Sequence, residues 1–173
     1  MDDKKIIING NHNKYYIKKA NREKLPEKRI VNYDDYILNY NNQVSVLYEL
    51  YINDDTSNNY CSLMKSEIQK KINSYKNQDV KKDKYDESLF TSYENVLELI
   101  VSQKVKCYYC KCNTYILYDN YREKCQWSLD RINNDIGHNK DNLLVSCLDC
   151  NLKRRNMNCD RFKKGKILKI IKE

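Results

Sequence analysis

Two pairs of cysteines have the spacing of ligands for a zinc ion. The sequence CYYC places Cys107 and Cys110 three positions apart, and CLDC repeats this spacing at Cys147 and Cys150. Each pair can turn two thiolates to one side of a tight turn, and two pairs complete the tetrahedral shell of a structural zinc ion. Such a site has no open position for water, so zinc there stabilises and does not catalyse. The alternative is that these four are unrelated buried thiols. The other cysteines, Cys61, Cys112, Cys125 and Cys159, are assigned as free thiols or core residues.

The residues between and after these pairs resemble a nuclease motif. LDRINNDIGHNKDN runs from Leu129 to Asn142, and the second pair continues as CLDCN and the basic segment LKRRN. In this order the block from Cys107 to Asn158 resembles the HNH endonucleases, the zinc-bearing branch of the ββα-metal nucleases. More weakly, the segments SYKNQD, QWSLDRINND and GHNKDN are similar to HNH proteins of large DNA viruses, which implies a viral protein in the nucleus or cytoplasm of a host cell.

The resemblance implies a second, catalytic metal ion. In the family, a carboxylate from the first strand and a side chain from the following helix hold one divalent ion, and Asp130 and Asn151 match these positions. Both are hard oxygen ligands, which suit Mg²⁺ or Mn²⁺ rather than zinc. Asn142 matches the middle asparagine of the motif, which in the family braces the loop and orients the catalytic base.

The chain departs from the family at the base itself. Arg131 stands at the position of the first histidine, and arginine stays protonated, so it cannot accept a proton from water. His138 is the remaining candidate, because the only other histidine, His12, lies in a polar N-terminal run. Two alternatives stay open: His138 only contacts backbone or phosphate, or a metal-bound hydroxide or the substrate replaces the base. With His138 as the base, Arg131 would clamp a phosphate, and the alternative for Arg131 is a salt bridge with Asp135 or Asp141.

Positive charge is concentrated after the second cysteine pair. The segment from Asn151 to Glu173 holds nine Lys or Arg residues against two acidic residues, an excess of seven in a chain whose net charge is +8. Its first three cations, Lys153, Arg154 and Arg155, are predicted to contact the phosphate backbone of DNA, which makes binding depend steeply on salt. The alternative is a solvated charged tail.

The pattern of apolar residues predicts an α+β fold around these side chains. Helical spacing predicts two amphipathic helices near residues 44–51 and 61–75, and a capping box of Thr91 and Glu94 opens a third, expected over Ser92–Gln103. QWSLDRI and NLLVSC are typical of strands, and LDCNLKRRN is typical of a helix. The predicted architecture is a mainly helical N-terminal part followed by a zinc-stapled ββα-metal (HNH) module.

A charged stretch without apolar periodicity, Lys76 to Ser88, is interpreted as a linker or surface loop. It divides the chain into residues 1–88, a helical region of unknown role, and residues 89–173, the HNH module with its basic tail. We expect Trp127, Tyr108 and Tyr109 to pack in the core under the zinc site rather than to stack on bases.

Composition limits the class of protein. A chain of 173 residues, 40 % hydrophobic, can bury a core, and its net charge of +8 favours an anionic partner. The sequence contains no signal-peptide core and no apolar run of membrane-spanning length, so we expect a soluble intracellular protein without a membrane partner. Eight cysteines in a reducing compartment are metal ligands or free thiols rather than disulfides.

These observations favour a metal-dependent HNH-type DNA endonuclease that hydrolyses phosphodiester bonds. One active site would nick DNA, whereas a homodimer would permit a double-strand cut. The first alternative is a non-catalytic, zinc-stabilised nucleic-acid-binding module, in which Arg131 records the loss of the base. The second is a zinc-stapled protein-interaction domain whose basic tail meets an acidic partner, which leaves Asp130, Asn142 and Asn151 unexplained.

Overall fold

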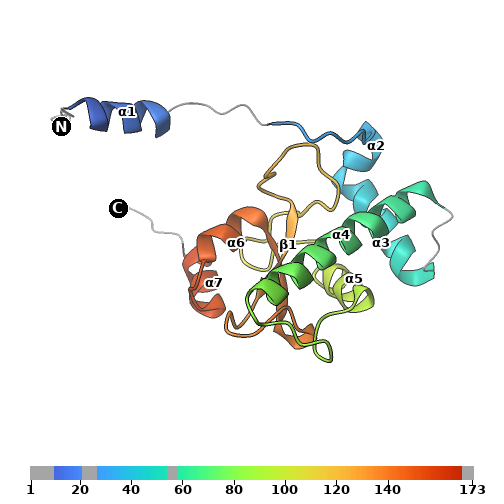
Figure 1. The fold of residues 1–173 in the computed structure, drawn as a ribbon. Helices are drawn as coiled ribbons and strands as arrows, with labels where there is room; N and C mark the ends of the chain where they lie inside the picture. Colours follow the sequence, from blue (N-terminus) through green and yellow to red (C-terminus); the bar gives the residue numbers. More distant parts are fainter. Residues whose placement is uncertain (1–9, 21–26, 54–57, 169–173) are drawn as a thin grey trace.

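The computed structural model describes residues 10–20, 27–53 and 58–168, and these form an α+β fold (Figure 1). This confirms the predicted class. Most helices precede a single two-stranded sheet, and two short helices follow it. The order of the elements is α1 (Asn11–Ala20), α2 (Asp35–Leu38), α3 (Tyr40–Asn53), α4 (Asn59–Lys81), α5 (Tyr93–Ser102), β1 (Trp127–Arg131), a 3-10 turn η1 (Lys140–Asn142), β2 (Leu143–Cys147), α6 (Leu148–Arg154) and α7 (Cys159–Ile167).

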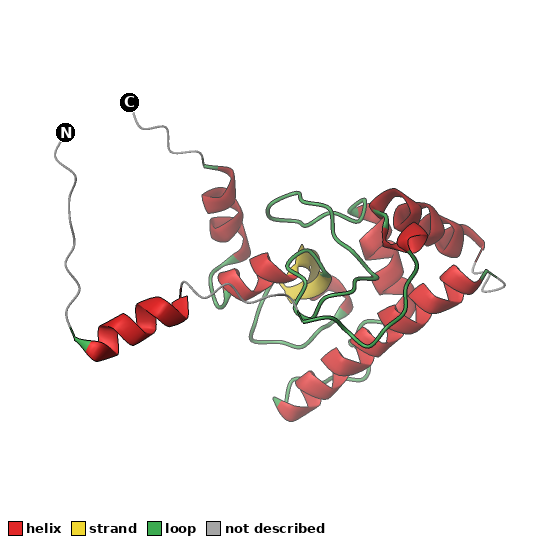
Figure 2. Ribbon diagram, turned by 90° about the horizontal axis from the view of Figure 1, so that it is seen from above, coloured by secondary structure: helices red, strands yellow, loops and turns green. Residues whose placement is uncertain are grey.

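The two strands form an antiparallel hairpin that carries the metal-site candidates. Trp127 pairs with Cys147 at one end, and Asp130 pairs with Leu144 near the other. Both strands lie within a residue of the predicted segments, because their apolar residues are buried on both faces. Figure 2 shows the hairpin in the middle of the molecule, with α6 and α7 on one side and the long α4 on another.

Helix α4 is longer than the sequence predicted. Asn58 caps its first turn, and its buried side chains follow helical spacing from one end to the other: Cys61, Met64, Ile68, Ile72, Tyr75 and Asp79. The helix therefore continues to Lys81, through the first half of the stretch that was interpreted as a linker or loop. That interpretation is wrong for 76–81 because Asp79, a polar residue, holds a place on the buried face where the apolar pattern ends.

The N-cap of helix α5 lies one residue later than predicted. Ser92, and not Thr91, is the N-cap, and its hydroxyl accepts a hydrogen bond from the Asn95 backbone N–H at 3.2 Å. Thr91 is buried instead, and its backbone N–H donates to the carbonyl of His138 at 3.1 Å. The start of α5 is thus attached directly to the loop between the strands.

The main hydrophobic core joins the two predicted regions of the chain. It contains side chains from α3, α4 and α5 together with Leu129 of β1 and Val145 of β2. The Tyr75 hydroxyl of α4 accepts a hydrogen bond from the Leu129 N–H at 3.0 Å, and Lys71 of α4 donates to the carbonyl of Trp127. The boundary expected between residues 88 and 89 therefore separates segments that share one core.

Candidate functional site

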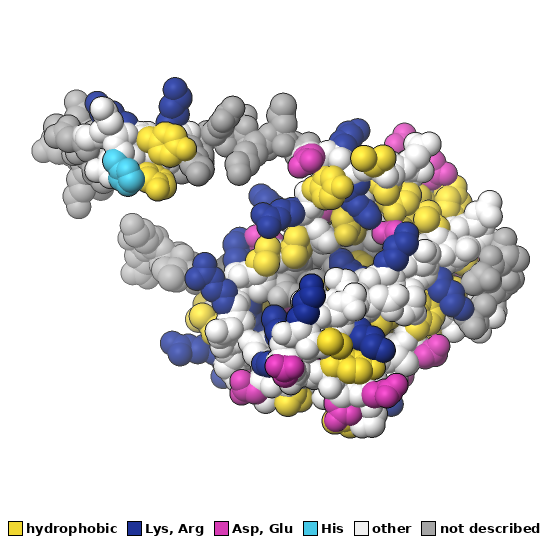
Figure 3. Space-filling view, viewed as in Figure 1, with side chains coloured by type: hydrophobic (Ala, Val, Ile, Leu, Met, Phe, Trp, Pro, Cys, Tyr) yellow, Lys and Arg dark blue, Asp and Glu magenta, His cyan; other side chains and the backbone are white. Residues whose placement is uncertain are grey.

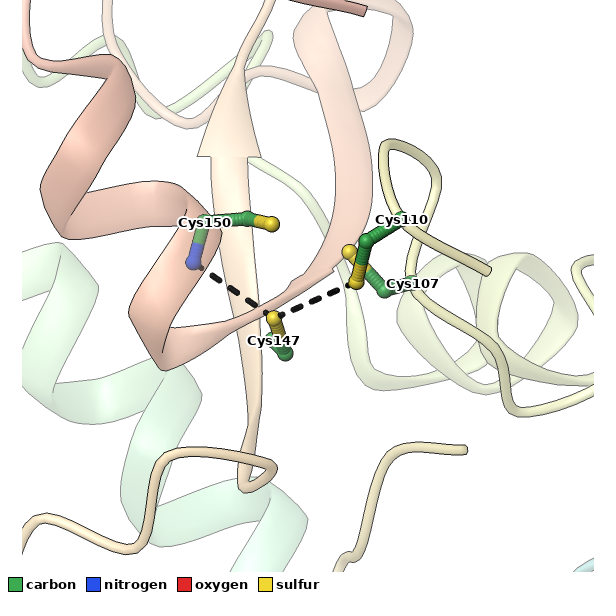
Figure 4. Close-up of side chains that lie close together, drawn as sticks. All are labelled: Cys107, Cys110, Cys147 and Cys150. Atoms are coloured by element: carbon green, nitrogen blue, oxygen red, sulfur yellow. Dashed lines mark hydrogen bonds between the residues drawn. The ribbon is translucent and has the colours of Figure 1, made fainter. Parts of the chain in front are cut away.

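The four predicted zinc ligands come together at one end of the hairpin. Their sulfur atoms all lie within 4.8 Å of one another (Figure 4). Cys107 and Cys110 come from the turn after α5, whereas Cys147 ends β2 and Cys150 lies in the first turn of α6. Among the residues that the structure describes, this is the one group of three or more His, Cys, Asp or Glu side chains close enough to hold an ion.

Backbone hydrogen bonds shape both turns. The Lys111 N–H donates to the Cys107 carbonyl at 3.0 Å, with Lys111 in the left-handed region (φ 62°), and the Tyr108 N–H donates to Val145 of β2 at 2.8 Å. In the second turn Cys147 is the N-cap of α6, and its sulfur accepts from the Cys150 N–H at 3.4 Å. Two separate turns are thereby fixed to one strand.

The sulfur positions fit a tetrahedral ion. Four thiolates about 2.3 Å from zinc lie about 3.8 Å from one another, and the Cys110 and Cys147 sulfurs are 3.9 Å apart. Hydrogen bonding from Cys147 lowers the pKa of Cys107 to about 4 and raises the pKa of Cys147 itself. Cys107 is therefore a thiolate at neutral pH, the form in which cysteine binds metal.

The aromatic residues near this cluster are mostly core. Tyr109 and Trp127 are each 1 % exposed, and Phe162 of α7 packs edge-on against Tyr109 with ring centroids 5.0 Å apart. This confirms the prediction for Tyr109 and Trp127. Tyr108 is only half-buried, and the Lys163 ammonium of α7 lies 4.0 Å from its ring centre.

The other cysteines divide into two kinds. Cys61 and Cys159 are buried in the hydrophobic core, as expected. Cys112 and Cys125 are only partly buried, and Cys112 packs against the cluster of Cys107, Tyr109, Cys147 and Cys150.

At the other end of the hairpin the structure brings Arg131 and His138, with the predicted metal ligands Asp130 and Asn151, to one surface hollow of about 330 Å³, which we call the strand-end hollow. Asn142, the third predicted catalytic residue, does not line it. Four segments line it: the C-terminal part of α4, the end of β1, the loop between the strands, and α6 with the residues after it. Its lining residues are Tyr75, Gln78, Lys82, Leu129, Asp130, Arg131, Asn134, His138, Asn151, Leu152, Arg155 and Asn156.

His138 is held in this hollow by a residue that the sequence did not single out. Its Nδ1 lies 2.9 and 3.0 Å from the two carboxylate oxygens of Asp79, and its backbone N–H donates to Asp79 Oδ2 at 2.6 Å. Burial lowers the pKa of His138 below its usual 6.5, although Asp79 acts in the opposite sense. The lowered pKa favours the neutral imidazole.

Asn142 braces the loop that carries His138. Its amide oxygen accepts from the Asn133 N–H at 2.8 Å, and its amide nitrogen donates to the carbonyls of Asn133 and Gly137 at 2.9 and 3.0 Å. The side chain therefore closes the loop on itself. Its part in orienting a base stays a prediction.

Arg131 lines the hollow at the end of β1. One guanidinium nitrogen donates to the Ile136 carbonyl at 3.0 Å. Because a guanidinium carries five N–H groups, this bond leaves donors for a ligand.

Asp130 is buried in a network of its own. Its Oδ1 accepts from Arg154 Nη1 and its Oδ2 accepts from the Tyr109 hydroxyl, both at 2.6 Å. Burial raises the pKa of Asp130, and the two donors offset part of this effect. Sequence reasoning did not identify Tyr109 as a partner of Asp130, because Tyr109 lies 21 residues from it, beside the predicted zinc ligand Cys110.

Asn151 has one side-chain atom to spare. Its amide nitrogen donates to the Ser128 hydroxyl and to the Leu129 carbonyl, each at 3.1 Å. Both bonds use the nitrogen and turn that nitrogen toward β1. The amide oxygen is the atom left to accept a hydrogen bond or bind a cation.

Asp130 and Asn151 carry oxygen atoms of the kind that bind divalent ions. An ionised carboxylate has about four lone-pair sites, of which Arg154 and Tyr109 occupy two on Asp130, and ligating carboxylates are commonly hydrogen-bonded in this way. The amide oxygen of Asn151 adds one neutral ligand. The charge of Arg154, however, already compensates the carboxylate and so weakens its attraction for a cation.

The three predicted phosphate contacts have three different environments. Arg155 lines the strand-end hollow, and Lys153 pairs with Asp149 at 2.7 Å on the exposed side of α6. Arg154 is 2 % exposed, and its guanidinium is the buried partner of Asp130. It also lines a second hollow, and its contact with phosphate stays a prediction. Figure 3 shows further Lys and Arg side chains over the side of the molecule formed by α6 and α7. Lys169 and Lys172, in the basic tail, lie outside the described residues.

Two further findings bear on the class of protein. Within the described residues, no helix is both long enough and apolar enough to cross a bilayer. What the structure shows is thus a four-cysteine cluster beside a β-hairpin that is followed by a helix, and no family model, curated protein or solved structure matches the chain significantly.

Proposed function

We propose that this protein is a metal-dependent, HNH-type DNA endonuclease that hydrolyses phosphodiester bonds, with a structural zinc ion bound by the four cysteines. The observation that carries the proposal is the content of the strand-end hollow. It combines an imidazole, a carboxyl group, an amide and three cationic side chains, which are His138, Asp130, Asn151, Lys82, Arg131 and Arg155. Phosphodiester hydrolysis needs a base, oxygen ligands and positive charge in one place.

His138 is the base in this proposal. Its lowered pKa favours the neutral form, it lines the hollow, and its Nδ1 is already bonded to Asp79. The other ring nitrogen, Nε2, accepts the proton of the attacking water. Arg131 cannot perform this step, because its guanidinium does not lose a proton.

Cationic side chains bind the phosphate. The forked guanidinium groups of Arg131 and Arg155 match two phosphate oxygens, and Lys82 adds a point charge at the α4 side of the hollow. A divalent ion on Asp130 and Asn151, when bound, neutralises charge on the scissile phosphate and on the leaving oxygen.

A second hollow next to the first supports the proposal of a nucleic-acid strand as substrate. It measures about 600 Å³ and shares Asn134 and Asn156 with the strand-end hollow. Lys84, Asn133 and Asn158 also line it. Polar donors and a cation next to the site are suited to the neighbouring sugar and phosphate groups of a nucleic-acid strand.

Cleavage of supercoiled plasmid with Mg²⁺ or Mn²⁺ tests the proposal. The variants Asp130→Asn and His138→Asn keep the size of each side chain, and each is expected to lose cleavage by about 10²-fold or more. His12→Asn, on exposed α1, is the matched control and should cleave like the wild type. Asp130→Asn at full rate would remove the metal assignment, and His138→Asn at full rate would remove the base. The ratio of nicked to linear product separates a monomer from a dimer.

One observation favours a second function, a zinc-stabilised module that binds nucleic acid without cutting it. Arg154 and Tyr109 occupy one site on each Asp130 oxygen, which gives this residue a structural role independent of metal. Under this alternative the wild type cleaves neither DNA nor RNA but binds both with a steep salt dependence. Arg155→Gln should then lower the slope of log binding constant against log salt by about 0.9, the loss of one phosphate contact.

A further inference from the structure

The strongest unassigned feature of the molecule is the pair formed by Asp79 and His138, 59 residues apart in sequence. The Asp79 side chain is 1 % exposed and that of His138 is 6 % exposed, so water does not compete for their hydrogen bonds. Both oxygens of Asp79 face Nδ1, and Oδ2 also accepts the backbone N–H of His138. Asp79 therefore acts as an acceptor toward both groups.

We propose that Asp79 is a positioning residue that fixes His138 as the Nδ1–H tautomer and thereby leaves the lone pair of Nε2 available in the strand-end hollow. A carboxylate only accepts hydrogen bonds, so the proton of a neutral imidazole facing it belongs on Nδ1. The inference rests on the proposed function, because a fixed tautomer matters to catalysis only if His138 is the base.

Further contacts hold the backbone and the ring of His138 in place. The His138 carbonyl accepts from the Thr91 N–H at 3.1 Å, and the ring lies against Tyr75 with centroids 4.5 Å apart. A Cβ added at Gly137 would lie 2.8 Å from Asp79 Oδ2 and closer still to the Lys84 carbonyl. The residue before His138 must therefore be glycine for the loop to approach α4 this closely.

Asp79 at this position in the helix is not explained by stability. It continues the buried stripe of Ile72 and Tyr75 in the last turn of α4, where an apolar residue would be the stable choice. A negative charge at a helix C-terminus opposes the helix dipole, and burial of a charge adds a larger cost. The hydrogen bonds that Asp79 accepts from the His138 backbone N–H and ring offset part of this cost.

The charges facing His138 come from two other elements. Lys82, just after α4, and Arg131 of β1 lower its pKa, burial lowers it further, and Asp79 raises it. Removal of Asp79 is therefore expected to extend cleavage activity to lower pH, in addition to the loss of rate, because the base stays unprotonated over a wider range.

The test uses ¹⁵N NMR of the zinc-loaded full chain in a His12→Gln background, so that His138 is the one histidine of the sequence. The wild-type pair should give a pyrrole-type signal for Nδ1 and a pyridine-type signal for Nε2. In Asp79→Asn the amide can donate to Nδ1, so the two signals should exchange character toward the Nε2–H form. Cleavage should fall by about 10²–10⁴-fold, the contribution of a positioned base. Asp83→Asn, which removes an exposed charge four residues further on, is the control and should change neither readout.

The outcomes are separable. An Nε2–H tautomer with Asp79 intact, or an unchanged spectrum in Asp79→Asn, overturns the proposal, and the first of these needs no variant at position 79. Exchanged signals with an unchanged cleavage rate overturn the catalytic part. If the wild type cleaves nothing, the proposed function fails, while the spectra still decide whether Asp79 fixes the tautomer.

Discussion

At the scale of single residues, Asp130 and Arg154 form a buried ion pair whose energetics distinguish a structural from a metal-binding role. Their side chains are 6 and 2 % exposed, and the Arg154 Nε has no hydrogen-bond partner among the described residues. Removal of one partner of such a pair leaves a buried charge and typically costs about 3–5 kcal/mol. Arg154→Met should therefore lower the free energy of unfolding by about that amount in the absence of divalent ions, measured by urea denaturation.

The same variant reports on the metal. If Asp130 binds Mg²⁺, loss of the competing guanidinium should let added Mg²⁺ restore part of the lost stability. Lys153→Met, which breaks the exposed pair with Asp149, is the control and should change little. Unaltered stability of Arg154→Met, with or without Mg²⁺, would contradict the buried-pair interpretation.

His138 makes stability depend on pH near neutrality. Its folded pKa lies below the unfolded value of about 6.5, so the unfolded chain binds more protons. The contribution is fully present above pH 6.5 and is lost as the pH falls toward the folded pKa. His138→Asn keeps a donor toward Asp79 but cannot titrate, so the wild-type loss of stability below about pH 6.5 should shrink in this variant. Equal pH profiles of stability for the wild type and His138→Asn would contradict this contribution of His138.

At the scale of elements, the sequence predicted the parts with strong local signals. The strands and the four-cysteine cluster follow from spacing and apolar pattern, and the helix after the second pair follows from the absence of a breaker. The extent of α4 and the partners of His138 and Asp130 could not be predicted, because each depends on a contact between distant residues. One signal was available: Asp79 lies four residues after Tyr75, on the buried stripe of an otherwise apolar face.

We expect the two turns at the cysteine end of the hairpin to depend on a zinc ion. Cys107→Ser or Cys150→Ser should remove bound zinc, measured as metal per chain, and a chelator should do the same to the wild type. Trp127, the one tryptophan of the sequence, pairs with Cys147 and should report the loss as a red shift of its fluorescence. Cys125→Ser is the control and should keep its zinc; loss of zinc in this variant would assign Cys125 to the metal shell.

The loop that presents His138 depends on one glycine. Gly137→Ala places a methyl group against Asp79 and the Lys84 carbonyl, so it should lower the free energy of unfolding by about 1–3 kcal/mol. Gly165→Ala in exposed α7 meets no atom within 4 Å and should raise it by about 0.5–1 kcal/mol, because alanine favours the helix. Urea denaturation measures both. A harmless Gly137→Ala would show that the loop can leave α4 without cost.

At the scale of the whole molecule, the hairpin that carries the active-site candidates shares one hydrophobic core with helices α2 to α5. Ile68 and Ile72 of α4 share a core with Leu129 and Val145 of the hairpin, and Tyr75 bonds to the Leu129 backbone. Apolar side chains that bury one another lose their contacts together. The N-terminal helices therefore supply part of the site, through Tyr75, Asp79 and Lys82, as well as half of the core around it.

A single unfolding transition is the expected consequence for the zinc-loaded full chain. Trp127 fluorescence reports the hairpin, whereas far-ultraviolet circular dichroism is dominated by helices, of which α4 is the longest described. Because the two probes observe segments on either side of residue 88 that share one core, their urea transitions should coincide in midpoint and slope. Two separated transitions would instead show that the hairpin and the N-terminal helices unfold independently. The Asp79–His138 contact would then lie between two independently folding units.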